Sequence, residues 1–123
     1  TDDGSTPLFM AAQNGHAEVV ALLVSGGAVV NQAKTTTGAT PLLIAAQKGH
    51  VEVVGLLING GAGVNQATTI DGTTPLFIAA QNGHAEVAGL LMSGGAALNQ
   101  VRTTDGATPL SMAADNGHTE VVR

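Results

Sequence analysis

The chain has no cysteine, tryptophan or tyrosine, and its only aromatic residues are Phe9 and Phe77. Without cysteine it has no disulfide framework, no thiolate metal site and no catalytic cysteine. Its core must therefore be built from aliphatic side chains and alanine. Glycine, in contrast, accounts for 17 of the 123 residues, which is about twice ordinary usage.

Basic residues are also few. The chain has four Lys and Arg but nine Asp and Glu, which gives a formal net charge of -5. Phosphate backbones and anionic membrane surfaces both need a basic footprint, so the composition argues against nucleic acid and membrane as partners. No apolar run approaches the length of a transmembrane span. Charged residues make up only 11% of the chain, so its polar surface must consist largely of Thr, Asn, Gln and Ser.

One eleven-residue segment, TPLFMAAQNGH at Thr6, recurs with few letters changed at a spacing of 34 residues, starting at Thr40, Thr74 and Thr108. Residues 6–39 and 74–107 are identical at 25 of 34 positions without a gap. A fixed period of this length indicates an array of stacked units. The units are 6–39, 40–73, 74–107 and a partial one over 108–123, which together form a single domain.

Each unit carries the signals of two short helices. Thr6 is a suitable N-cap and Pro7 a suitable first helical residue, while Gly15 can end the helix in a left-handed conformation. In the second helix Val19, Leu22 and Leu23 have the spacing of one apolar face. The pattern predicts helices over 7–14, 17–25, 41–48, 51–59, 75–82, 85–93 and 109–116.

The rest of each unit is β-branched, polar and glycine-containing, which is typical of an extended loop or hairpin. A pair of short helices cannot bury its apolar stripe alone, but copies stacked on one another can. Repeated alanine pairs such as Ala11–Ala12 and Ala45–Ala46 allow neighbouring helices to approach closely.

The units resemble ankyrin repeats over essentially the whole chain. The resemblance is carried by Thr-Pro-Leu at 6–8, Gly15-His16, Leu22-Leu23 and Gly27-Ala28, and by their counterparts in the later units. It implies an all-α solenoid of stacked helix-turn-helix units with projecting β-hairpin or loop fingers.

Two features depart from the ankyrin pattern. The period is 34 residues rather than 33, so the finger is enlarged. The family's signature histidine is replaced by Phe9, Leu43, Phe77 and Ser111. Because that histidine helps to fix the loop, other groups must stabilise the finger here, with the threonines and Asn31, Asn65 and Asn99 as candidates.

Differences between the units concentrate in two zones, which the resemblance places on the concave binding face. The finger-tip candidates are Thr36, Thr37, Ala39, Ile70, Asp71, Thr73, Thr104, Asp105 and Ala107. The candidates at the ends of the first helices are Gln13, Asn14, Gln47, Lys48, Gln81, Asn82, Asp115 and Asn116. The alternative is that these are simply unconstrained solvent positions.

Metal binding and catalysis find little support in the sequence. The four histidines, His16, His50, His84 and His118, occupy one position of the repeat. Stacked helices lie about 8–10 Å apart while a histidine–zinc bond is about 2 Å, so two of these residues cannot share an ion. We interpret them as turn residues that bond to the backbone. The four glutamates are likewise one position repeated, suited to the helix dipole, and no cofactor motif is present.

The sequence therefore predicts a non-catalytic scaffold that binds another protein through its finger tips and first helices. A structural element that self-assembles through apolar array ends is the alternative, and an engineered array is a third possibility, against which the helix-weakening Gly55 argues. The last unit stops before its Leu-Leu pair, so we expect a segment of a longer array whose ends stack on neighbouring molecules. The sequence names no partner or compartment, and the resemblance slightly favours an intracellular one.

Overall fold

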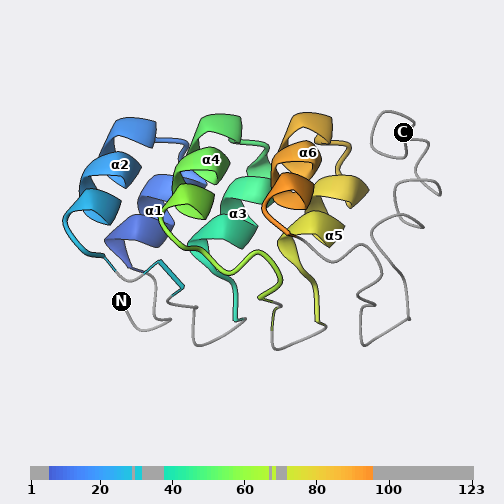
Figure 1. Cartoon of the computed structure of the whole chain (residues 1–123), viewed down its shortest axis with the longest axis horizontal. Coiled ribbons are helices and arrows are strands. Elements are labelled where there is room, and N and C mark those ends of the chain that lie inside the picture. Colours follow the sequence, from blue (N-terminus) through green and yellow to red (C-terminus); the bar gives the residue numbers. More distant parts are fainter. Residues whose placement is uncertain (1–5, 29, 32–37, 67, 69–71, 96–123) are drawn as a thin grey trace.

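Six short helices form the described part of the computed structural model, which covers residues 6–28, 30–31, 38–66, 68 and 72–95 (Figure 1). They are α1 (Pro7–Gln13), α2 (Ala17–Ser25), α3 (Pro41–Lys48), α4 (Val51–Asn59), α5 (Pro75–Gln81) and α6 (Ala85–Ser93). Their bounds agree with the sequence prediction to within one residue, and no strand occurs within the described ranges. The predicted helix over 109–116 lies outside them.

The first helix of each unit starts at a threonine cap, as the sequence predicts. Thr6 is extended, and its hydroxyl accepts a hydrogen bond from the Phe9 N–H at 3.1 Å. The same bond recurs from Leu43 to Thr40 and from Phe77 to Thr74, each at 3.2 Å. At the other end the chain turns through Gly15, Gly49 and Gly83, whose φ angles of 72°, 75° and 73° are left-handed. Only glycine adopts this conformation without strain.

The helices form two layers, with α1, α3 and α5 side by side in one and α2, α4 and α6 in the other (Figure 1). Each helix packs against its hairpin partner and against the equivalent helix of an adjacent described unit. The core between the layers is aliphatic, as the composition requires, and includes the fully buried alanines Ala12, Ala45, Ala46, Ala79 and Ala80. The small side chains let the first helices stack closely. None of the described helices is long and apolar enough to cross a bilayer.

The apolar face predicted for α2 is largely exposed, because no described unit packs on that side of the helix. Val20 is fully buried, whereas Val19 and Leu22 are 45% and 73% exposed. In the next unit Val53, the counterpart of Val19, is only 1% exposed, because α2 packs over α4. Positions 19 and 22 therefore face the preceding unit of the stack rather than the core of their own unit. The spacing of apolar residues along one helix does not show which of these two neighbours the apolar side faces.

The loops are linked by asparagine side chains, one of the options that the sequence left open. Asn31 Oδ1 accepts a hydrogen bond from the Gly63 N–H at 2.7 Å, and Asn65 Nδ2 donates to the Gly95 carbonyl at 3.5 Å. Thr68 and Thr73 bond to each other across one finger, through their backbones at 2.9 Å and through the Thr68 hydroxyl at 3.2 Å. Asparagines therefore link consecutive loops and threonines bond across one finger, while Asn99 lies outside the described residues.

Candidate partner-binding face

Six of the predicted face residues lie together at the C-terminal ends of α1, α3 and α5. Because these three helices stack side by side, they form a row with two members per unit. Asn14, Gln47, Lys48 and Asn82 are exposed, while Gln13 and Gln81 are half-buried. We call this set of six the amide row.

The remaining candidates divide into two groups. Thr36, Thr37, Ile70, Asp71, Thr104, Asp105, Ala107, Asp115 and Asn116 lie outside the described residues. Ala39 and Thr73 are described, and both are buried, at 9% and 7% exposure.

The burial of Ala39 and Thr73 corrects their assignment as finger-tip contacts. Each directly precedes a capping threonine, Thr40 or Thr74, at the point where the finger enters the helix layer. A partner needs accessible side chains, so these two residues do not belong to the face. Their position next to a cap was visible in the sequence and could have indicated burial.

Histidines hold the backbone beneath the amide row in register. The Gln13 carbonyl accepts a hydrogen bond from His50 Nε2 at 3.1 Å, and the Gln47 carbonyl accepts one from His84 Nε2 at 3.0 Å. Because a carbonyl oxygen can only accept, the bonded nitrogen must carry the proton. The interpretation of these histidines as turn residues that bond to backbone is thus confirmed for His50 and His84, and the bond joins two units.

The histidine rings also explain why glycine is needed at positions 15 and 49. A Cβ added to Gly49 would lie 2.8 Å from the His84 ring, and one at Gly15 would lie 2.9 Å from the His50 ring. The rings of His50 and His84 therefore rest directly on the turn of the unit before each of them. Sequence reasoning assigned Gly15 to helix termination and missed this second role.

Lys48 is the chemical exception in the amide row. At the equivalent position of the next unit, Asn82 Nδ2 donates to the Gln47 carbonyl at 3.2 Å, which ties its side chain down. Lys48 is exposed, and its side chain has no hydrogen bond or ion pair within the described ranges, where it is also the one Lys or Arg. The row therefore presents one untethered cation between amide groups.

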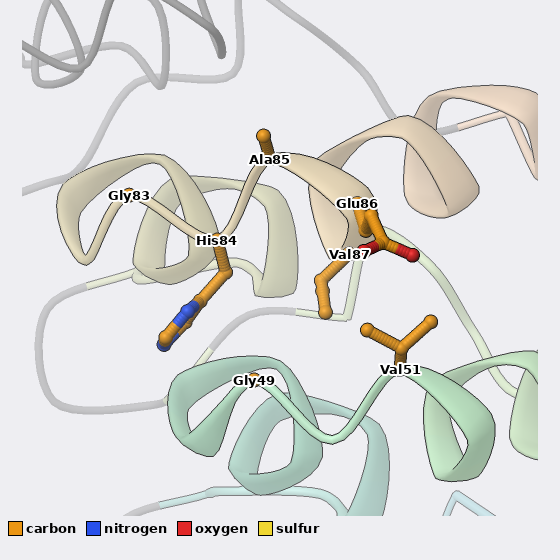
Figure 2. A pocket seen from close by; sticks show the side chains of 7 residues that line it. All are labelled: Gly49, Val51, Gly83, His84, Ala85, Glu86 and Val87. Carbon is orange, nitrogen blue, oxygen red and sulfur yellow. The ribbon is translucent and has the colours of Figure 1, made fainter.

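A shallow pocket of about 270 Å³ lies between the α3–α4 and α5–α6 turns (Figure 2). Its walls are Gly49, Val51, Gly83, His84, Ala85, Glu86 and Val87. Figure 2 shows the His84 ring directed towards Gly49, while the Glu86 side chain lies on the far side of the turn. The two ionisable groups do not converge on a common point, so this pocket holds no acid–base pair. Within the described ranges no group of three or more His, Asp or Glu could hold a metal ion.

Comparison with known proteins agrees with this architecture. A family model described as ankyrin repeats, in three copies, matches residues 1–68 and 56–123, which together span the chain. The chain belongs to the ankyrin repeat family. Ankyrin repeats generally mediate protein–protein interactions and are typically non-enzymatic. A search of curated proteins found no match.

Proposed function

We propose that this ankyrin array is a non-catalytic scaffold that binds a partner protein at the amide row, with Lys48 as its central charged contact. The supporting observation is the contrast between a fixed backbone and accessible side chains. His50 and His84 bond to the backbone of the preceding unit, while Gln47 and Lys48 remain exposed. A preorganised surface loses less conformational entropy on binding than a mobile one.

The chemistry of the amide row favours a polar partner segment. Amide side chains both donate and accept hydrogen bonds, and the ammonium group of Lys48 suits a carboxylate. A single exposed cation contributes more to orientation and association rate than to affinity. We therefore expect the partner to place an acidic side chain opposite Lys48, with hydrogen-bonding groups on either side. The finger-tip candidates Thr36, Thr37, Ile70, Asp71, Thr104, Asp105 and Ala107 extend the proposed face.

Affinity capture with matched baits tests this proposal. The test bait carries Lys48→Glu together with Gln47→Ala, and the control bait carries Glu52→Gln, an exposed change in the first turn of α4. We expect proteins recovered by the wild-type and control baits to be lost from the test bait. Thermal midpoints of the three baits are measured first, because Lys48→Glu and Glu52→Gln each remove a charge that suits its helix end, and capture is compared only at a temperature at which all three are folded.

The outcome also locates the site if the proposal is wrong. Partners that bind the test bait as well as the wild type would remove the amide row from the binding face. Loss of the same partners from the Glu52→Gln bait would instead place the site on the second helices. A filament-forming role, the other candidate, depends on apolar contacts between arrays, for which the exposed Met10, Val19 and Leu22 are the available side chains.

A further inference from the structure

The amide row repeats at one spacing along the stack, because the same contact joins each pair of described units. His50 Nε2 donates to the Gln13 carbonyl at 3.1 Å, and His84 Nε2 donates to the Gln47 carbonyl at 3.0 Å. Helices α1, α3 and α5 lie side by side in one layer (Figure 1), and packed helices are about 8–10 Å apart. A partner that contacts successive units must place its own contacts at this spacing.

The hydrogen-bonding chemistry of the row favours an extended partner segment. The Gln47 carbonyl already accepts from His84 Nε2 and from Asn82 Nδ2, at 3.0 and 3.2 Å, so this residue offers a partner its exposed side-chain amide. An amide group donates and accepts, and therefore pairs with backbone N–H and C=O groups as well as with side chains. An α-helix bonds most of these backbone groups internally, whereas an extended segment leaves them available.

The spacing of the row distinguishes between the extended conformations. In a β-strand the side chains of one face are two or four residues apart, which is about 6.6 or 13 Å, and neither distance matches. A polyproline II helix has three residues per turn, so every third side chain points the same way at intervals of about 9.3 Å. Its backbone has no internal hydrogen bonds. Polyproline II thus combines the required spacing with available backbone groups.

A hollow beside the row has room for the residues that lie between two contacts. It is the pocket of about 270 Å³, and it borders the row because Gly49 and Gly83 in its wall directly follow Lys48 and Asn82. Figure 2 shows it between the turn at Gly49 and the turn at Gly83 and His84. A shallow hollow of this size suits a compact ring such as that of proline, the residue whose fixed φ favours polyproline II.

We propose that the segment bound at the amide row is a proline-rich polyproline II helix, with a hydrogen-bonding side chain at every third position and a carboxylate opposite Lys48. The proposal rests on the function proposed for the amide row and names the class of partner. Lys48 is the one Lys or Arg in the described ranges, so it determines which turn of the segment lies on α3. A preformed polyproline II helix loses little conformational entropy on binding, which suits a row of few contacts.

NMR titration of the isotope-labelled full chain with synthetic peptides tests the proposal. The test peptide consists of three Pro-Pro-X triplets, in which X is Gln, Glu and Gln in turn. One control peptide has the same composition, with Gln, Glu and Gln placed consecutively between prolines. A second control carries the same three residues seven positions apart in an alanine-rich helix. We expect the test peptide to bind about fivefold more tightly than either control, or better, because each control loses hydrogen-bonding positions on the row.

A charge swap between protein and peptide tests the contact at Lys48. Lys48→Glu should weaken the test peptide by roughly threefold or more, and it should restore binding to a peptide in which Lys replaces the central Glu. Restored binding also shows that the variant is folded. Glu52→Gln, an exposed change in the first turn of α4, is the matched control and should leave the affinity for the test peptide unchanged.

Several results would overturn the proposal. They are no binding of the test peptide up to about 1 mM, the weak end of specific affinities, equal or tighter binding of either control peptide, and binding that Lys48→Glu leaves unchanged. Failure of this inference is distinguishable from failure of the proposed function. If the Lys48→Glu and Gln47→Ala bait loses its captured proteins while the test peptide does not bind, the amide row binds a partner of another shape, and only the polyproline II assignment is wrong.

Discussion

Glycine has two different roles along α4 and its cap. Gly55 lies inside the helix, where a Cβ would meet nothing within 4 Å. Gly60 lies at the helix end, where a Cβ would lie 2.6 Å from Val24 Cγ1. Only the second glycine is required by packing, while the first weakens the helix and leaves its site unfilled.

Substitution by alanine should separate these roles. Gly55→Ala should raise the free energy of unfolding by about 0.5–1 kcal/mol, because alanine has the higher helix propensity and fits without strain. Gly60→Ala should lower it by about 1–3 kcal/mol, since the added methyl forces Val24 to move. Urea denaturation with unchanged m-values measures both. If Gly55→Ala destabilises the protein, the site beside Gly55 is not open as the structure has it.

Three leucines that look alike in the sequence should differ in their contribution to stability. Leu57 is fully buried, Leu56 is half-buried against α2, and Leu22 is 73% exposed. Leu57→Ala should cost about 2–5 kcal/mol, Leu22→Ala within about 0.5 kcal/mol, and Leu56→Ala an intermediate amount. Denaturation midpoints in dilute solution rank the three variants by stability. Equal midpoints for Leu22→Ala and Leu57→Ala would contradict the burial of Leu57 and the exposure of Leu22.

At the scale of the helix, the sequence predicted well which helices exist and where each begins and ends, because the signals for these features lie within a few residues of the helix ends. A Thr-Pro pair marks the start of a helix and a glycine marks its end, whichever residues lie in the other units. The 34-residue period then shows that each unit has the same helices. The orientation of Val19 and Leu22 was not predictable in the same way, because it depends on the adjacent unit. For the same reason the sequence indicated Gln47 and Lys48 correctly as exposed but included the buried Ala39 and Thr73 in the face.

The threonine caps provide a prediction at this scale. Thr74 is buried, and its hydroxyl accepts the Phe77 N–H at 3.2 Å. Thr74→Ala should therefore destabilise the protein by about 0.5–2 kcal/mol, near the upper end because the freed N–H is shielded from water. Thr74→Ser keeps the hydroxyl and should recover most of the loss. Equal stability of the alanine and serine variants would show that the hydroxyl does not cap α5.

At the scale of the whole molecule, the described units are held together by contacts that repeat at every joint. A histidine bonds to the carbonyl of the preceding unit, an asparagine links consecutive loops, and an aliphatic side chain covers a glycine. In such an array stability is approximately the sum of the intrinsic stabilities of the units and the nearest-neighbour interface terms. The unit formed by α3 and α4 has a described neighbour on both sides, whereas the unit formed by α1 and α2 has one on one side.

Native-state hydrogen exchange on the full chain, in dilute solution, tests this account most directly. We expect the slowest exchange in α3 and α4 and faster exchange in α2, with the Gly55→Ala change slowing exchange in α2 and α6 as well as in α4, because the interfaces transmit its stabilisation. Equal protection of α2 and α4 in the wild type, or a Gly55→Ala effect confined to α4, would contradict the claim that interfaces between the repeats hold this array together.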